Sequence, residues 1–172
     1  GVGGPFPVNI LFMNSIGPQI WGGGEKWMLT AAEGLRERGH GVDFCGRNNA
    51  LFLSRCRERG FTVVPLKIGS DFGLGNIGRL RRVYREREID VVIANFNKDV
   101  RLAGLAACGG EPSVVARNGL PLIPNNWRYR LTYTALAKGI VTNTEAIKRR
   151  YLSYGWFRDG FIRVIHNGID VD

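Results

Sequence analysis

The amino-acid sequence predicts one α/β domain, a doubly wound, mostly parallel, Rossmann-like sheet of about seven strands with helices on both faces. Short apolar stretches alternate with stretches of helical pattern along nearly the whole chain, as is typical of strand–helix–strand units. Residues 90–94 are largely apolar without alternation, which indicates a strand buried on both faces. No low-complexity linker interrupts residues 1–172, so we expect a single domain.

The first half of the chain supplies three of the expected strands. Residues 8–13 form the first strand, and a glycine-rich loop leads from it to a helix at residues 25–38 with apolar residues at helical spacing. Gly39 is expected to end this helix, because glycine is common just past a helix end. The pattern continues with a strand at 42–45, a helix at 50–59 and a strand at 61–66.

The second half of the chain repeats the alternation. Thr142 and Glu145 have the spacing of a capping box, which predicts the start of a last helix that runs to about residue 154. The other expected elements are helices at 75–87, 99–108 and 127–137, and strands at 90–94, 113–117, 139–142 and 161–165.

The composition excludes several classes of protein. The three cysteines are far apart in the sequence and form no Cys-x-x-Cys pair, so we expect reduced thiols rather than disulfides or a structural zinc site. No apolar run is long enough to span a bilayer, and no secretory leader is evident. These features favour a cytoplasmic protein.

The net charge is the outlying feature of the composition. The 24 Lys and Arg residues exceed the 15 Asp and Glu residues, for a formal charge of +9. Such an excess favours anionic partners such as phosphates, nucleic acid or an acidic membrane surface. The alternative is that the arginines cover the solvated faces of helices.

Candidate site residues follow from the expected sheet, because ligands of such sheets bind at loops beyond the carboxyl ends of the strands. The loop at residues 14–24 ends in Gly22, Gly23 and Gly24 at the start of a helix. Backbone amides there carry partial positive charge, and glycines let a phosphate or sugar approach closely. Glu25 and Lys26 follow and could contact hydroxyl groups. The alternative is that the glycines only shape a turn.

Two further loops at this edge carry polar residues. In the loop at 95–99, Lys98 could neutralise a phosphate, and Asp99 could orient or deprotonate an acceptor hydroxyl as a catalytic residue. Asp99 could equally cap the following helix. After the next strand, Arg117 and Asn118 could bind sugar hydroxyls or a phosphate, unless they belong to an ordinary loop.

Four motifs, in the right order, resemble those of family 4 glycosyltransferases, the retaining enzymes of GT-B architecture. The loop at residues 22–25 resembles the family's Gly-Gly-x-Glu loop, and residues 38–42 are similar to its Arg-Gly-His-x-Val turn. Residues 142–144 resemble Thr-Asn-Ser, and residues 164–170 are similar to the Val-Ile-Pro-Asn-Gly-Ile-Asp that closes the N-terminal domain. Asn97 and Lys98 look like the Asn-Lys loop of the family's lipopolysaccharide-core and surface-polysaccharide transferases.

The resemblance implies two facing Rossmann-like domains, of which this chain is the N-terminal, acceptor-binding half. The expected partners are a nucleotide-sugar, a glycan or lipid-linked acceptor and the chain's own C-terminal domain, whose absence should leave this half inactive alone. The resemblance also implies that the helix start at Gly23 and Gly24 stabilises the leaving diphosphate without a metal or other cofactor. The Asp170–Asp172 pair is accordingly attributed to the closing motif, so no metal site is expected.

The sequence departs from the family pattern at two positions. Arg117, Asn118 and Gly119 stand in the loop where many members carry a histidine, so that histidine's role cannot be carried over to this chain. His166 stands where proline is usual, and it is interpreted as a residue of the junction rather than as a catalyst.

Two basic, aromatic stretches suggest a membrane surface as a partner. Residues 74–87 and 127–133 mix arginines with aromatic and aliphatic residues, and either could rest on an anionic bilayer at the inner face of the membrane. The alternative for residues 74–87 is an amphipathic surface helix, and the alternative for residues 127–133 is packing against the sheet or an acceptor.

Two rival functions stay open at this point. Residues 73–78 match the Gly-x-Gly-x-x-Gly dinucleotide fingerprint of an oxidoreductase, but they do not follow directly from a strand, so the match is attributed to chance. A basic nucleic-acid-binding module is the second rival, but no recognition motif supports it, and nucleic acid is not an expected partner.

Overall fold

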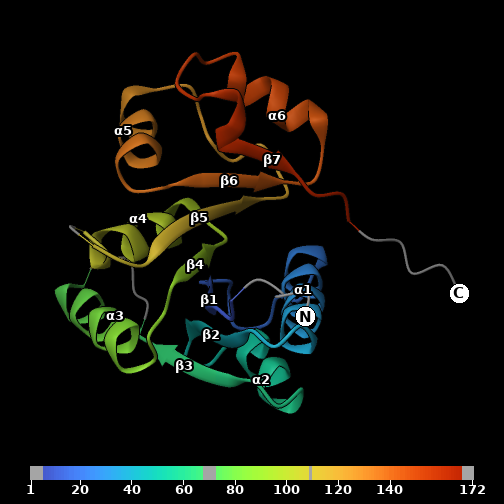
Figure 1. The fold of residues 1–172 in the computed structure, drawn as a ribbon, viewed down its shortest axis with the longest axis vertical. Coiled ribbons are helices and arrows are strands. Elements are labelled where there is room, and N and C mark those ends of the chain that lie inside the picture. The colour runs from blue at the N-terminus through green and yellow to red at the C-terminus, as the bar shows by residue number, and fades with distance from the viewer. Residues whose placement is uncertain (1–5, 68–72, 109, 168–172) are drawn as a thin grey trace, which may run out of the picture.

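The computed structural model describes residues 6–67, 73–108 and 110–167. They form a seven-stranded sheet of order β3-β2-β1-β4-β5-β6-β7, in which every adjacent pair of strands is parallel. The α/β, doubly wound, Rossmann-like fold expected from the sequence is confirmed (Figure 1). The last three residues of the closing motif at 164–170, and with them the Asp170–Asp172 pair, lie outside the described residues.

Within these described residues, strands and helices alternate with one exception, a short 3₁₀ helix (Asp159–Phe161) before β7. The strands are β1 (Asn9–Asn14), β2 (Gly41–Arg47), β3 (Thr62–Leu66), β4 (Val91–Ala94), β5 (Ser113–Asn118), β6 (Gly139–Thr142) and β7 (Ile162–Val164). The helices are α1 (Gly23–Glu37), α2 (Leu51–Glu58), α3 (Leu74–Glu86), α4 (Asn97–Ala106), α5 (Trp127–Ala135) and α6 (Glu145–Leu152).

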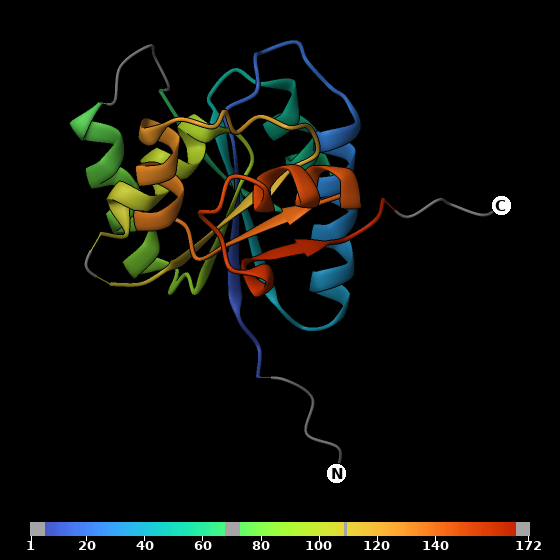
Figure 2. The same ribbon diagram turned by 90° about the horizontal axis from the view of Figure 1, so that it is seen from above.

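Helices cover both faces of the sheet, as expected. Buried residues of α1 and α2 share one core cluster, and buried residues of α3, α4, α5 and α6 share the other. Figure 2 shows α1 on the right of the sheet and α3 and α5 on the left. This arrangement follows from the strand order, because the chain leaves the centre in both directions through crossovers of one hand.

The alternation of side chains along the central strands supplies both cores. Along β1, Ile10 and Phe12 belong to the cluster under α1 and α2, whereas Leu11 and Met13 belong to the opposite cluster. All four are buried, which explains why the central strands lack polar residues at alternate positions. Among the aromatic contacts, Phe12 and Phe44 stack with ring centroids 5.3 Å apart.

The expected helix ends are close to the observed ones, with two corrections. Gly39 and Gly60 follow α1 and α2 with φ of 86° and 79°, the left-handed region that favours glycine. The cap of α6 is Thr144, whose side chain accepts the Ile147 N–H, rather than Thr142. The helix α4 begins at Asn97, so the expected loop at 95–99 is only two residues long.

The strand order fixes where a ligand can enter. The chain turns from β1 to α1 on one face and from β4 to α4 on the other, although β1 and β4 are neighbours in the sheet. A crevice therefore opens between the carboxyl ends of these two strands. In Figure 2 the loop after β1 lies at the top of the molecule, opposite the N-terminus. Of the helices described, none has the length and apolar character needed to cross a membrane.

A substitution at Gly104 tests how closely α4 packs on α5. A Cβ at Gly104 would lie 2.6 Å from the Leu136 Cβ, so Gly104→Ala should lower the free energy of unfolding by about 1–3 kcal/mol through overpacking. Gly78 in α3 is a matched control, because its Cβ would meet nothing within 4 Å and Gly78→Ala should stabilise by up to about 1 kcal/mol. Chemical denaturation of both variants measures the difference; equal effects would contradict the close helix approach.

Candidate functional site

A pocket of about 410 Å³ lies at the crevice between the carboxyl ends of β1 and β4. Its walls come from the start of α1, the short loop after β4, the end of β5 and the loop that follows, and Asn143 beyond β6. The glycine loop and the Arg117 region, which the sequence placed at one edge, therefore meet around one cavity.

The start of α1 forms one wall of the pocket, and Glu25 holds it in place. Gly22 precedes the helix, and its N–H donates to Glu25 Oε2 at 3.0 Å. Glu25 Oε1 accepts from Asn14 Nδ2 at 2.9 Å, and only 4% of Glu25 is exposed. Both carboxylate oxygens are thus bonded within the protein, so Glu25 fixes the glycine loop rather than presenting a free carboxylate to a ligand.

Gly23 and Gly24 open the first turn of α1 toward the pocket. A Cβ at Gly23 would meet nothing within 4 Å, so Gly23 borders open space. A Cβ at Gly24 would lie 3.0 Å from Arg117 Nη1. Gly24 therefore makes room for the guanidinium of Arg117 beside the helix start, and it is this side chain that a larger residue would displace first.

Arg117 is the cation of this pocket. It lies at the end of β5 rather than in a loop, and it is 7% exposed. Its guanidinium packs over the Trp27 ring at 4.9 Å and against Gly119, where a Cβ would come within 2.9 Å of it. Burial lowers the pKa of Arg117, and the nearby charge of Glu25 opposes that shift; a guanidinium nonetheless stays charged.

The charge of Arg117 is not balanced by a direct ion pair. Among the residues described, no carboxylate lies within ion-pair distance of its guanidinium. A buried cation without a carboxylate is unfavourable unless an anion or a favourable dipole compensates it. The pocket thus combines a guanidinium that has no direct ion pair among these residues with the N-terminal end of a helix, whose amides also attract negative charge.

Three buried polar residues that the sequence analysis missed hold the crevice together. Asn14 Oδ1 accepts from Ile16 N at 3.0 Å and from Asn95 Nδ2 at 3.2 Å. Ser15, which is also buried, donates its N–H to Asp99 Oδ2 at 3.0 Å. Each stands directly at the end of an apolar strand, and that position is the signal that would have identified them.

Asp99 lies in the first turn of α4 and is fully buried. Its Oδ2 accepts the N–H of Ser15 and the N–H of Phe96, at 3.0 and 3.1 Å. These contacts are those expected if Asp99 caps α4, the alternative that the sequence left open. Asp99 is not among the residues that line the pocket. Its catalytic role stays a prediction, which these contacts do not support.

The other residues that the sequence predicted to bind substrate lie in different surroundings. Asn97 donates from Nδ2 to Leu122 O at 2.9 Å, and its Oδ1 accepts from the Tyr133 hydroxyl, so its amide holds the loop after β5. Asn118 is 1% exposed and Lys98 is half-buried. Lys26 is exposed and lies on the other side of α1 from the pocket, in a separate groove.

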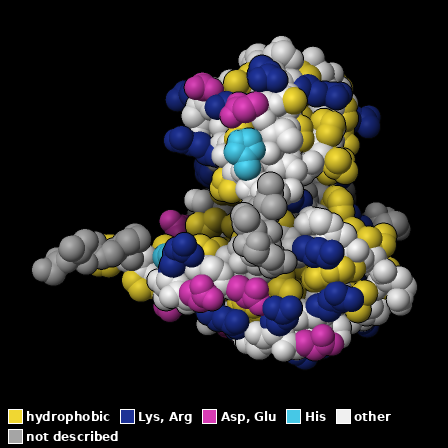
Figure 3. All heavy atoms as spheres, turned by 90° about the vertical axis from the view of Figure 1, so that its right-hand side faces the viewer, with side chains coloured by type: hydrophobic (Ala, Val, Ile, Leu, Met, Phe, Trp, Pro, Cys, Tyr) yellow, Lys and Arg dark blue, Asp and Glu magenta, His cyan; other side chains and the backbone are white. Residues whose placement is uncertain are grey.

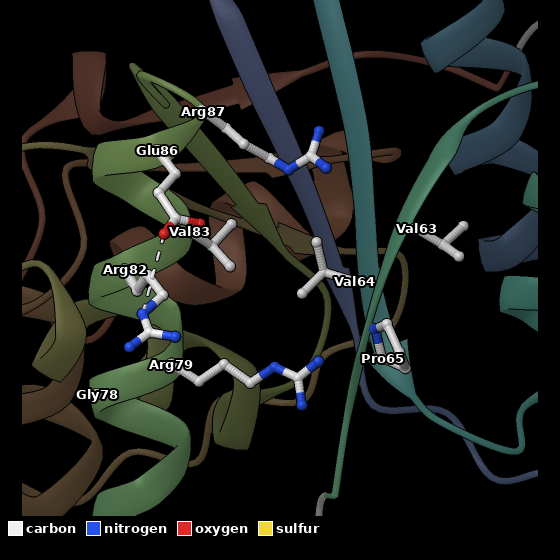
Figure 4. Close-up of a pocket in the computed structure, with 9 residues that line it drawn as sticks. All are labelled: Val63, Val64, Pro65, Gly78, Arg79, Arg82, Val83, Glu86 and Arg87. Carbon is white, nitrogen blue, oxygen red and sulfur yellow. Dashed lines mark ion pairs between the residues drawn. The ribbon is translucent and has the colours of Figure 1, made fainter.

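A larger groove between β3 and α3, about 770 Å³, is not part of this crevice (Figure 4). Its arginines belong to an amphipathic helix, as the alternative for residues 74–87 proposed: Leu80, Val83 and Tyr84 are buried, and the arginines face outward. Arg82 pairs with Glu86, and Arg87 pairs with Asp43. No residue lining this groove comes from the loops after β1, β4, β5 or β6.

The dinucleotide fingerprint at residues 73–78 also lies outside the crevice. Gly75 and Gly78 face open space, since a Cβ at either position would meet nothing within 4 Å. In a dinucleotide-binding turn the last glycine permits close packing of the helix on the sheet, and the open space at Gly78 shows no such packing there. The attribution of this match to chance agrees with the geometry.

Asp99 should make stability depend on pH. Burial raises the pKa of Asp99 from 3.8 to about 6, although its hydrogen bonds to Ser15 and Phe96 oppose the shift. The folded state therefore holds this proton more tightly than the unfolded state, and the free energy of unfolding should fall by about 2–3 kcal/mol as pH rises from about 4 to about 6.

Asp99→Asn keeps an acceptor for the backbone N–H groups but cannot ionise, so it should flatten that part of the pH profile. The exposed Asp159 pairs with Lys148, and Asp159→Asn should leave the slope as in the unmodified protein. Urea unfolding at several pH values measures the effect, and an unaltered slope in Asp99→Asn would contradict it.

Comparison with known proteins identifies the family. The family described as Glycosyltransferase Family 4 matches residues 21–172, whereas no curated protein matches significantly. The structure of HepE from Anabaena in complex with UDP is 19% identical and covers 95% of this chain and 45% of HepE, with a TM-score of 0.75. A glycosyltransferase from Rickettsia africae is 17% identical and covers 95% of this chain and 44% of its own, with a TM-score of 0.78.

A third solved structure, the lipopolysaccharide outer core galactosyltransferase WaaB, is 13% identical and covers 96% of this chain and 47% of WaaB, with a TM-score of 0.75. At these identities the structures show a shared fold, and the chain spans less than half of each of them. Because the family match extends over most of the sequence, the chain belongs to glycosyltransferase family 4.

Proposed function

We propose that the chain is the N-terminal, acceptor-binding half of a retaining glycosyltransferase. In this proposal the whole enzyme transfers a sugar from a nucleotide-sugar to a lipid-linked or polysaccharide acceptor in bacterial envelope synthesis. The observation that carries the proposal is the pocket at the crevice, where the start of α1 and the guanidinium of Arg117, which has no direct ion pair within the described part of the chain, face the same space.

The pocket is suited to the charge that sugar transfer generates. As the glycosidic bond to the leaving group breaks, positive charge develops on the sugar and negative charge on the departing diphosphate. Amides at the start of α1 and the guanidinium of Arg117 would stabilise that negative charge, because they are fixed before the reaction begins. UDP or a UDP-sugar is bound in the HepE structures, which supports a nucleotide-sugar as the donor here.

Polar atoms without a hydrogen-bond partner gather at the carboxyl edge of the sheet. Among the residues described, four buried side-chain atoms have no hydrogen-bond partner: Asp99 Oδ1, Asn118 Nδ2, Thr142 Oγ1 and Asn143 Oδ1. All belong to the ends of β5 and β6 or to the segments just beyond β4 and β6. Buried polar groups are rarely left unpaired, so unmet hydrogen-bonding capacity is concentrated at the edge where the pocket lies.

The outer surface of α5 supports contact with a membrane. Trp127 is 71% exposed and Leu131 is 60% exposed, which shows that neither packs against the sheet. Leu120, in the loop before α5, is also exposed, and the Arg128 guanidinium lies 5.6 Å from the Trp127 ring. Exposed Trp and Leu beside arginine suit the interface of an anionic bilayer, which supports our proposal that the enzyme binds peripherally at the inner face of the membrane.

Arg117→Ala in the full-length enzyme should lower kcat/KM by about 10- to 100-fold, because a charge-assisted hydrogen bond contributes about 1.5–3 kcal/mol. Gly24→Ala should also lower kcat/KM, since its Cβ would displace the same guanidinium. Steady-state assays with a panel of UDP- and GDP-sugars measure the loss. Arg38→Ala, on an exposed arginine at the end of α1, should leave activity unchanged. Full activity of Arg117→Ala would refute the role of the pocket.

Replacing Trp127 and Leu131 together by serine should weaken binding to vesicles that contain phosphatidylglycerol, because the helix loses most of its exposed apolar surface. Burying two such side chains contributes about 3–5 kcal/mol in the limit of full insertion. Vesicle co-sedimentation measures the change, with neutral phosphatidylcholine vesicles as the control for charge. Equal sedimentation of the unmodified and double-serine proteins would exclude this surface.

A further inference from the structure

A second groove, about 560 Å³, lies between α1 and α2, on the opposite side of α1 from the pocket. Trp21 and Trp27 contribute aromatic walls, and Lys26 and Arg55 contribute positive charge. Figure 3 looks at the side of the molecule on which α1 and α2 lie, and shows Lys and Arg side chains beside hydrophobic patches.

The groove adjoins the pocket at the start of α1. Gly23 and Asn167 line both cavities. Trp27 lies between the two cavities, because its ring lines the groove and also contacts the Arg117 guanidinium, 4.9 Å from the ring centroid. A chain of sugars with its reacting end in the pocket could therefore pass over Gly23, which has no side chain, and continue into the groove.

The charge of the groove is positive after its internal pairing is counted. Arg59 and Glu33 form an ion pair at 2.8 Å and compensate one another. Within the part of the chain that the structure describes, Lys26 and Arg55 have no carboxylate partner. The Arg55 guanidinium instead lies over the Trp21 ring at 4.5 Å, where both of its edges can still donate hydrogen bonds.

We propose that this groove binds an anionic saccharide segment of the acceptor, whose carboxylate or phosphate groups meet Lys26 and Arg55. The apolar C–H faces of pyranose rings pack on indole rings, and the two cations select sugars that carry negative charge. This inference rests on the proposed function, because it assigns the groove to the acceptor of the same reaction. It adds that acceptor recognition extends across α1, beyond the crevice.

Calorimetric titration of this chain tests the groove directly. The probes are an oligogalacturonate, the same oligosaccharide after reduction of its carboxyl groups, and a maltooligosaccharide phosphorylated at C6. We expect the oligogalacturonate to bind at least about tenfold more tightly than its reduced form. Binding of the phosphorylated maltooligosaccharide in place of oligogalacturonate would identify phosphate as the recognised group. Equal affinity for the charged and reduced oligosaccharides, with no binding of the phosphorylated one, would overturn the proposal.

Arg55→Glu should weaken binding of the charged saccharide by about tenfold or more, because it replaces attraction by repulsion. Arg57→Glu is a matched control: Arg57 is also in the last turn of α2 and exposed, but it does not line the groove. Its effect should stay within about twofold. An equal loss in both variants would mean that only the overall charge matters, and would overturn the proposal. Trp21→Ala, checked by thermal unfolding, tests the aromatic wall separately.

Kinetics of the full-length enzyme separate this inference from the proposed function. Arg55→Glu should raise KM for a charged acceptor about tenfold and leave kcat and KM for the nucleotide-sugar unchanged. If Arg117→Ala lowers kcat/KM as expected while Arg55→Glu has no effect on acceptor KM or on calorimetric binding, the acceptor role of the groove is wrong and the proposed function stands. If no sugar transfer occurs with any donor, the proposed function fails, and with it the acceptor role of the groove.

Discussion

The site depends on the buried side chain of Asn14, which joins three segments that the fold would otherwise let diverge. At the crevice, the chain leaves β1 toward one face of the sheet and β4 toward the other. Asn14 bonds to Asn95 beyond β4, to the backbone of its own loop, and to Glu25 in α1. Because Asn14 has no exposed surface, each lost bond would leave a buried polar group unsatisfied. The geometry of the glycine loop follows from this constraint.

The glycines and Arg117 are parts of one arrangement. Gly24 and Gly119 leave a narrow space in which the planar guanidinium lies, and Trp27 supports one of its faces. Placing Arg117 there buries it without a carboxylate of the described residues at ion-pair distance, which is unfavourable for the protein alone. An arrangement of this kind is expected where a ligand supplies the missing negative charge. Glu25 is close enough for its charge to act on Arg117, but its two oxygens accept hydrogen bonds from Gly22 and Asn14.

The sequence was sufficient for the order of elements and for the position of the glycine loop, because both follow from hydrophobic periodicity and from glycine at a helix start. It was not sufficient for Asp99, since a carboxylate at a helix start has the same local sequence whether it caps or catalyses. Only the contacts of Asp99 with Ser15, which is remote in sequence, and with Phe96, which is near in sequence, distinguish the two roles. Likewise, the packing of Gly119 on Arg117 depends on side-chain direction, which periodicity does not specify.

The basic residues fall into two groups, those on solvent-exposed helix faces and those that line a cavity at α1. Arginines of α3 face solvent, and Arg82 and the following Arg87 are paired with carboxylates, so they form no site at the crevice. Arg117 and Arg55 differ from them, because each lies against an indole ring. The helix α1 stands between these two arginines, and its Trp27 lines the outer groove while its ring contacts Arg117 of the pocket. A shift of α1 would therefore alter the anion pocket and the outer groove together, so that the rigidity imposed by Asn14 and Glu25 serves both.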